Sequence, residues 1–224
     1  VVLDRTPFYA ESGGQTGDTG TITVAGGEFN VTNTTKLGNA FAHHGTVQGR
    51  IGVNDKVDAT IDDARRDSIK KNHTATHILH EALRQLLGDH VGQKGSLVQP
   101  DRLRFDFSHF SKVSEEEIKR VEVSVNAQIQ EQLQLVEHRN IPIKEALEKG
   151  AMALFGEKYG DSVRMIEFGE SKELCGGIHV KNTVEIWHFQ IISEGAVAAG
   201  IRRIEAITGD AVKDFYSNQE STLA

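Results

Sequence analysis

The sequence contains a single cysteine, Cys175, among 224 residues, so an intramolecular disulfide is excluded. A chain without disulfides fits a reducing cytosol, where cysteine more often serves a metal or a reaction. No apolar run approaches the ~20 residues of a membrane-spanning helix, and no basic start followed by an apolar stretch indicates a secretion signal. We therefore expect a cytoplasmic protein that does not enter a membrane.

Positive charge is also scarce, because 25 Lys and Arg face 32 Asp and Glu, which leaves a formal net charge of -7. Broad, nonspecific coating of nucleic acid is excluded, since it needs excess cations to neutralise phosphates, but a local basic track is not. The hydrophobic and charged fractions, 38% and 25%, are those of an ordinary globular chain of one or two domains. No initiator methionine precedes Val1, so we expect a piece of a longer protein.

The first 62 residues are rich in glycine and threonine and lack a helical period. Short runs typical of strands lie between turn signals, at residues 20–24, 28–32 and 56–61. We predict a small split β-barrel of the kind found in translation proteins, over residues 1–62.

Two helices are predicted after this region. The first is capped by Asp62 or Asp63, runs through Leu87 and ends at Gly88, with apolar residues recurring near the helical period. The second follows a capping box of Ser114 and a glutamate three residues later, and its apolar stripe is typical of a surface that faces a core.

Alternating or β-branched runs predict four further strands, at residues 103–107, 162–168, 187–193 and 201–207. The last two are joined through the glycine- and alanine-rich stretch 194–200, and one or two short helices are expected from Pro142 to about Phe155. We predict an α+β fold in which helices pack on one side of an antiparallel sheet over residues 63–208. Residues 209–224 begin a helix that leads onward.

Two short motifs far apart in the chain contain the ligand types of one zinc site. His73 and His77 are four residues apart, which puts both imidazoles on one helix face. Cys175 and His179 flank glycines that let the backbone fold tightly round one ion. A sulfur with three nitrogens favours zinc over hard cations. Each pair alone also fits packed core residues, and the full set fits a structural zinc clip.

The helix that holds the first histidine pair also carries cations. At ~100° per residue, Arg66 and Lys70 share a stripe with His73, His77 and His80. Such a face suits an anionic substrate whose phosphates contact the cations, or it is simply a solvated basic face. A zinc protease is excluded, because a threonine stands where that motif has its glutamate.

The motifs together resemble the editing domain of alanyl-tRNA synthetase, which is closely similar to free-standing alanyl-tRNA editing proteins. The resemblance covers almost the whole chain, with runs in matching order at residues 4–15 (DRTPFYAESGGQ), 73–77 (HTATH), 103–109 (LRFDFSH), 175–179 (CGGIH) and 197–206 (VAAGIRRIEA). Ile178 departs from that family, which commonly has threonine there, but it is not a ligand position.

The resemblance implies the editing fold of threonyl- and alanyl-tRNA synthetases and hydrolysis of tRNA(Ala) mischarged with serine or glycine. A synthetic site for alanine cannot strongly reject glycine or serine, so a second, hydrolytic site supplies the missing discrimination. Zinc would be held by the two histidine and cysteine motifs: His73, His77, Cys175 and His179. The metal either activates a water or anchors the substrate.

Other residues receive roles as hypotheses. Gln15, in a flexible Gly-Gly-Gln turn, would position substrate or water, although a plain turn is the alternative. Asp106 and His80 are candidates for contact with the reacting substrate, as assigned to Asp106, or for a hydrogen bond to a ligand imidazole, as assigned to His80. A structural role is the alternative for both. Contacts with phosphates of the tRNA acceptor end are assigned to Arg66, Lys70, Arg202 and Arg203.

No ATP site is visible in this span, so ATP-dependent ligation of alanine would belong to another part of a longer synthetase. Two alternatives stay open from the sequence. One is a zinc-stabilised tRNA-binding module without activity, and the other is a free-standing protein that edits in trans.

Overall fold

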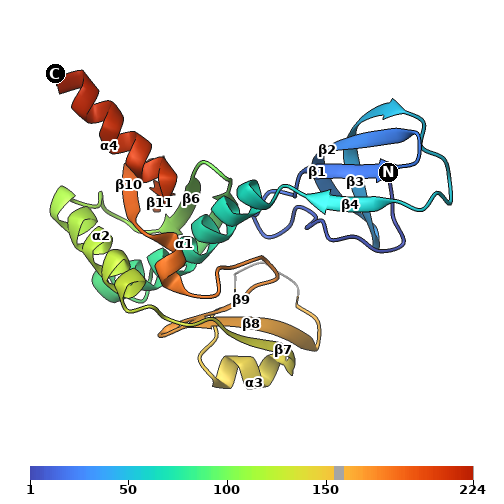
Figure 1. Cartoon of the computed structure of the whole chain (residues 1–224). Helices are drawn as coiled ribbons and strands as arrows, with labels where there is room; N and C mark the ends of the chain where they lie inside the picture. Colours follow the sequence, from blue (N-terminus) through green and yellow to red (C-terminus); the bar gives the residue numbers. More distant parts are fainter. Residues whose placement is uncertain (154–158, 224) are drawn as a thin grey trace.

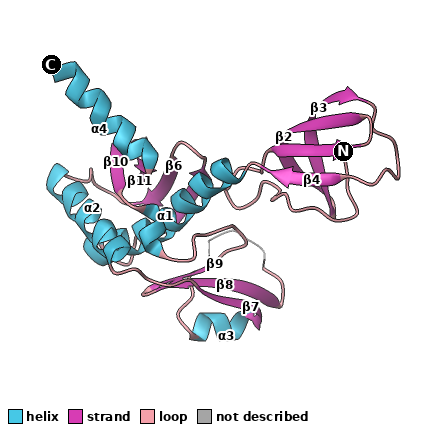
Figure 2. Ribbon diagram, viewed as in Figure 1, coloured by secondary structure: helices cyan, strands magenta, loops and turns pink. Residues whose placement is uncertain are grey.

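The structure is a computed structural model that describes residues 1–153 and 159–223. It confirms the predicted α+β class, because antiparallel sheets and four α-helices make up the described part. Figure 2 shows strands alone in the N-terminal region, whereas the rest of the molecule contains both helices and strands. No helix in the described residues is long and apolar enough to cross a membrane.

The N-terminal region is an open antiparallel sheet of order β3-β2-β1-β4, built from β1 (Gly20–Val24), β2 (Gly27–Leu37), β3 (Ala40–Gly49) and β4 (Asp58–Ile61). The predicted barrel is wrong in that no closed barrel forms among the described residues. Closure needs the edge strands to pair with each other, but the four-residue β4 pairs with β1, and β3 pairs with β2 and through an isolated bridge between Val2 and Ala42. The strand β3 has no counterpart in the prediction, because most of its residues are exposed and its polar and apolar residues do not alternate.

The predicted first helix is confirmed as α1 (Asp63–Leu87). The Asp62 carboxylate accepts a hydrogen bond from the Arg65 backbone, and Gly88 ends the helix with a φ of 114°. Every residue from 72 to 80 is buried, although several of them are polar. The middle of α1 therefore lies inside the molecule, where its polar groups need partners.

A second sheet of order β10-β11-β6-β5 comprises β5 (Gln93–Val98), β6 (Leu103–Ser108), β10 (Phe189–Ala198) and β11 (Ile201–Thr208). The strands predicted at residues 103–107 and 201–207 are confirmed. The connection predicted over residues 194–200 is wrong for most of its length. Its backbone pairs with β11 as far as Ala198 opposite Ile201, so only Ala199 and Gly200 make the turn.

A third sheet of order β7-β8-β9 comprises β7 (Val136–Pro142), β8 (Ser162–Phe168) and β9 (Ser171–Leu174). Helix α3 (Ile143–Glu148) packs on β7 and β8. The helical prediction that extended to Phe155 ends outside the described residues. Helix α2 (Glu115–Gln130) begins with the predicted capping box, and a short 3-10 helix (Thr183–Ile186) and α4 (Asp210–Leu223) complete the order.

Helix α1 is the central element of the molecule (Figure 1). It contacts α2, β5, β6, β9 and β11, and its apolar side chains join the main core with those of α2 and the second sheet. The boundaries predicted after residues 62 and 208 coincide with changes of element, since β4 gives way to α1 and β11 to α4. The division into domains stays a prediction.

Candidate metal centre

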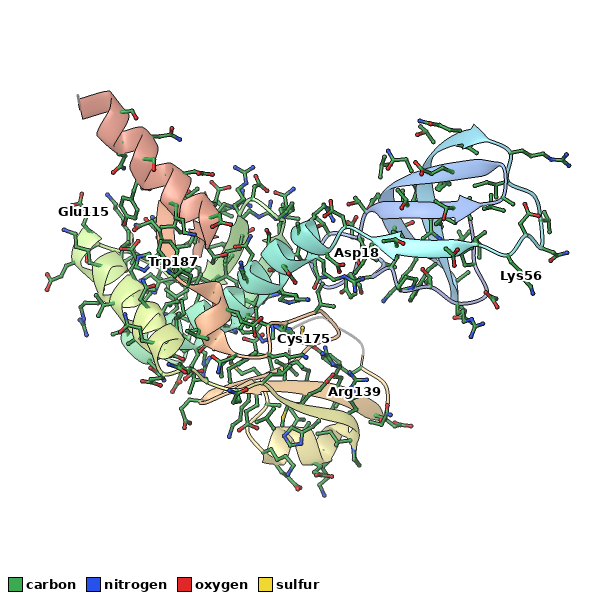
Figure 3. All side chains as sticks on the ribbon, viewed as in Figure 1. Asp18, Lys56, Glu115, Arg139, Cys175 and Trp187 are labelled. Atoms are coloured by element: carbon green, nitrogen blue, oxygen red, sulfur yellow. The ribbon has the colours of Figure 1, made fainter. Side chains whose placement is uncertain are left out.

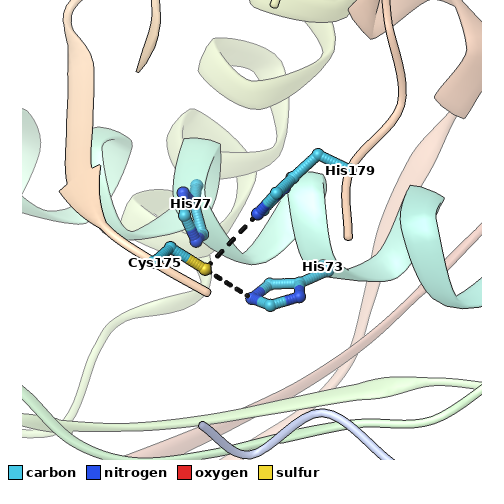
Figure 4. Close-up of side chains that lie close together, drawn as sticks. All are labelled: His73, His77, Cys175 and His179. Carbon is cyan, nitrogen blue, oxygen red and sulfur yellow. Dashed lines mark hydrogen bonds between the residues drawn. The ribbon is translucent and has the colours of Figure 1, made fainter. Parts of the chain in front are cut away.

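Four side chains from two distant parts of the chain meet beside α1 (Figure 4). One ligand atom each of His73, His77, Cys175 and His179 lies within 4.8 Å of the others. The first two side chains project from the buried middle of α1, and Cys175 directly follows β9. The structure therefore brings together all four residues that were predicted as metal ligands.

The two separations from the Cys175 sulfur fit a tetrahedral zinc ion. Sγ of Cys175 lies 3.5 Å from Nε2 of His73 and 3.4 Å from Nε2 of His179. Around a tetrahedral zinc ion, a sulfur at ~2.3 Å and a nitrogen at ~2.0 Å from the metal are about 3.5 Å apart. One soft sulfur and three imidazole nitrogens are also the donor types that zinc accepts.

Gln15 fixes the orientation and tautomer of His73. Its Oε1 accepts a hydrogen bond from the backbone N–H of Ile178 at 2.9 Å, so this atom is the amide oxygen. The same oxygen lies 2.7 Å from Nδ1 of His73, which must therefore carry the proton and donate. Nε2 of His73 keeps its lone pair and faces Cys175.

The Gly-Gly-Gln turn reaches the cluster because it docks on β5. The backbone N–H of Val98 donates to the Gly14 carbonyl, and the Val98 carbonyl accepts from Thr16. Gln15 is fully buried, and its Nε2 has no hydrogen-bond partner among the described residues. The turn is thus more than a surface loop, and its side chain touches a candidate ligand directly.

His77 and His80 are linked through Glu173, a residue that the sequence analysis missed. One Glu173 oxygen lies 2.9 Å from Nδ1 of His80 and the other 3.5 Å from Nε2 of His77. His80 thus reaches the ligand through this carboxylate. Nδ1 of His77 is buried without a partner in the described part of the chain, and a metal ion would supply one. The sequence did hold a signal for Glu173: it is an acidic residue two positions before Cys175, and residues two apart in extended chain point to the same side.

Burial keeps the cluster's imidazoles neutral. It lowers the pKa of His73 and His179 well below 6.5, and neighbouring imidazoles and Arg164 lower both further. Burial also lowers the pKa of His77, against the opposing influence of Glu173. A neutral imidazole offers a lone pair to a metal, so the cluster is electrostatically ready to bind one.

The loop between Cys175 and His179 passes tightly over His73. A Cβ on Gly177 would overlap Cε1 of His73 and lie 2.8 Å from Oε1 of Gln15, whereas a Cβ on Gly176 would meet nothing within 4 Å. Arg164 holds the same loop from β8, because its Nη1 donates to the carbonyls of Cys175 at 2.9 Å and Gly177 at 2.6 Å. No sequence pattern pointed to Arg164.

A small cavity of about 100 Å³ opens beside the cluster. Its lining is mostly polar and combines ligands, the N-terminal turn and β5, including Tyr9, Ser12, His73, Thr76, His77, Gln93, Ser96, Glu173 and Cys175. Asp106, predicted to contact substrate, is not part of this lining. It instead forms a two-pronged ion pair with Arg203, at 2.6 and 2.8 Å.

The cations predicted to contact phosphates are all paired within the protein. Arg203 binds Asp106 and Arg202 binds Glu194. Arg66 is paired with the buried carboxylate of Asp18 and also donates to the carbonyl of Pro7. Lys70 lies 2.7 Å from Asp67, on the more exposed part of α1. Their contact with RNA stays a prediction.

The chain is similar to known proteins over its whole length. The chain is 66% identical to the alanine-tRNA ligase of Pseudoalteromonas translucida and 64% identical to that of Flavobacterium psychrophilum. Each match covers 100% of this chain and 26% of the relative. The chain belongs to the alanyl-tRNA synthetase family. It spans about a quarter of the length of the curated relatives it matches.

Two family models match separate parts of this synthetase segment. The model for class II (A) tRNA synthetases matches residues 1–65, which include the open sheet and the Gly-Gly-Gln turn. The model for the second additional domain of threonyl and alanyl tRNA synthetases matches residues 163–205, which include Cys175 and His179. The candidate metal centre is therefore built from both matched regions together with α1.

Proposed function

We propose that this chain is an editing domain that hydrolyses the ester bond of tRNA(Ala) mischarged with serine or glycine. The observation that carries the proposal is the cluster of three imidazoles and one thiol beside a small polar cavity, in a chain of the alanyl-tRNA synthetase family. A hydrolytic site of this kind supplies discrimination that a pocket for alanine cannot, since one methyl group or hydroxyl changes binding by only ~1–3 kcal/mol.

The cavity offers partners for a serine hydroxyl. Thr76 lines it and donates its hydroxyl proton to the Asn72 carbonyl at 2.8 Å, so its oxygen lone pairs are free to accept. Alanine has no hydroxyl and would leave these polar groups unpaired, which disfavours the correctly charged tRNA.

His73, His77, Cys175 and His179 would hold the zinc ion. When bound, zinc supplies Lewis-acid activation of a water or of the ester carbonyl, or an anchor for the substrate's amino group. Gln15 keeps the His73 ring in place, and Thr74, whose hydroxyl lies 3.1 Å from Nδ1 of His179, does the same on the other side.

The chain would act as part of a longer synthetase in the cytoplasm, with tRNA(Ala) as its partner. Its relatives are ligases about four times as long, and we assign ATP-dependent ligation of alanine to the remainder of such an enzyme. A free-standing protein that edits in trans would use the same site and differs only in what adjoins it.

The alternative is a zinc-stabilised tRNA-binding module without activity. It is favoured by the presence of four protein ligands, which is the usual set of a structural zinc site, whereas catalytic sites commonly keep one position open.

Single-turnover deacylation separates the two functions. Wild-type protein loaded with zinc should hydrolyse Ser-tRNA(Ala) and spare Ala-tRNA(Ala), and His77→Ala should abolish this while circular dichroism shows a retained fold. His44→Ala, which removes an exposed imidazole from β3, is the matched control and should hydrolyse like the wild type. Tight tRNA binding by a zinc-loaded wild type that hydrolyses neither ester would establish the binding module instead.

A further inference from the structure

A second, larger cavity lies on the other side of the loop that follows Cys175. Its volume is about 420 Å³, and it is open to solvent. It shares Gly176 and Gly177 with the small cavity, and its remaining lining comes from Ile178 and from polar residues of the third sheet, Arg139, Asn140 and Arg164. Figure 3 shows Arg139 at the edge of this sheet and Cys175 between the sheet and α1.

An irregularity of the third sheet gathers the three polar residues at one point. β7 and β8 pair with His138 opposite Met165 and Ile141 opposite Val163, so two residues of β7, Arg139 and Asn140, face the single residue Arg164. Asn140 has a φ of 54°, which is uncommon outside glycine. Bulges of this kind re-aim side chains and are frequent beside binding sites.

The charge of this cavity matches one phosphodiester. Glu137 accepts a hydrogen bond from Arg139 at 3.0 Å and another from Arg164, so two guanidinium groups share one carboxylate and leave one net positive charge. The Arg139 side chain is 72% exposed and can turn toward a ligand, whereas Arg164 is 26% exposed and already holds the loop carbonyls.

Given the proposed function, we propose that this cavity binds the terminal ribonucleotide of the tRNA, with Arg139 contacting its phosphate and Asn140 its base or ribose. The small cavity then receives the aminoacyl group, and the ester linkage lies beside Gly176 and Gly177, which both cavities share. A volume of about 420 Å³ falls within the ~300–1,000 Å³ typical of small-ligand sites, whereas about 100 Å³ suits only an aminoacyl group.

Binding of a non-hydrolysable probe tests this site without relying on activity. The probe is tRNA(Ala) that carries serine through a 3′-amide, bound to the full zinc-loaded chain. Arg139→Gln should weaken binding about tenfold, as expected for loss of a charge-assisted contact, and lower the slope of log K against log salt by about 0.7. Lys144→Gln is the matched control, because it removes one charge from an 88% exposed side chain of the adjacent helix α3, and it should stay within about twofold.

A shortened tRNA locates the contact. On a tRNA that lacks the terminal nucleotide, Arg139→Gln and wild type should bind equally. The assignment would be overturned if Arg139→Gln and Lys144→Gln lost the same affinity for the probe. It would also be overturned if Arg139→Gln still bound the shortened tRNA more weakly than the wild type does.

Serine methyl ester, which has no nucleotide, keeps the two proposals separate. The assignment predicts that wild type and Arg139→Gln hydrolyse it at the same rate, and a slower rate for the zinc-loaded variant would count against it. If the wild type hydrolyses no ester but Arg139→Gln still binds the full-length probe more weakly than Lys144→Gln does, the proposed function fails and the nucleotide site stands.

Discussion

At the scale of single residues, the metal centre depends on a side chain that is not a ligand. The Gln15 oxygen accepts from His73 and from the backbone of Ile178, so it joins the N-terminal turn, α1 and the loop after Cys175 at one atom. From the sequence, Gln15 was assigned to substrate or water, but its side-chain oxygen contacts a candidate ligand and the loop after Cys175. We therefore expect it to act first on the metal.

Replacement of Gln15 by methionine should lower zinc affinity about 10- to 100-fold, because His73 loses the acceptor that fixes its tautomer. Competition with a chromophoric chelator measures the affinity. Gln93→Met, at a residue that lines the cavity, is the control and should bind zinc like the wild type. Unchanged zinc affinity with slower deacylation in Gln15→Met would return Gln15 to its predicted role with substrate.

The two glycines after Cys175 should respond very differently to an added methyl group. Gly177→Ala places a Cβ against the His73 ring and should lower zinc affinity at least tenfold, because either the ring or the loop must move. Gly176→Ala meets no atom within 4 Å and should bind zinc normally. The same chelator titration compares the two variants. Equal zinc affinities would show that the loop can move away from His73 without weakening the metal site.

At the scale of elements, local signals explain why the helices were predicted well. The α2 capping box is complete: the Ser114 hydroxyl accepts from the Glu117 backbone, and the Glu117 carboxylate accepts from the Ser114 backbone. Such pairs involve residues three apart and need no tertiary contact. The strands β3, β5, β7 and β9 were missed, although β5 and β9 pair with the strands next to them in the chain, β6 and β8. They lack a helix-like cap or period that would mark them locally.

Removal of the Ser114 cap should destabilise the protein by about 1 kcal/mol, because the backbone N–H of Glu117 loses its acceptor, the Ser114 hydroxyl. Urea unfolding of Ser114→Ala measures the loss. Ser114→Asp retains a capping oxygen and should unfold within a few tenths of a kcal/mol of the wild type. If Ser114→Ala and Ser114→Asp lost the same free energy of unfolding, the capping oxygen at position 114 would contribute nothing to stability.

At the scale of the whole molecule, a buried ion pair joins the N-terminal region to α1. Arg66 contacts Asp18, whose side chain is 2% exposed and also accepts from the Tyr9 backbone at 2.7 Å. The same guanidinium donates to the Pro7 carbonyl. These contacts hold the segment that carries the Gly-Gly-Gln turn against the helix that carries the histidines.

Arg66→Met should lower the free energy of unfolding by about 3 kcal/mol, because it leaves the buried Asp18 carboxylate uncompensated. Lys70→Met, one turn further along α1, removes a more exposed cation and should change stability by less than about 0.5 kcal/mol. Chemical denaturation compares the two. If Arg66→Met unfolds like the wild type and only tRNA binding weakens, Arg66 serves the predicted phosphate contact instead.

The sequence by itself determined the α+β class, the bounds of α1, the start of α2 and the two halves of the metal cluster. Helix caps, helical periods and the spacing of His73 from His77 are local properties, which short stretches of chain express alone. The meeting of those histidines with Cys175 was inferred from ligand chemistry rather than from any local pattern.

Only the tertiary structure decided the open N-terminal sheet, the roles of Glu173 and Arg164, and the pairing of the predicted RNA-binding cations with carboxylates. Several depend on groups nearly a hundred residues apart, such as His77 with Glu173 and Asp106 with Arg203, which meet only in the folded chain. A charge in a sequence carries no mark of its partner. Whether an arginine faces RNA or a buried aspartate follows from where the chain places it.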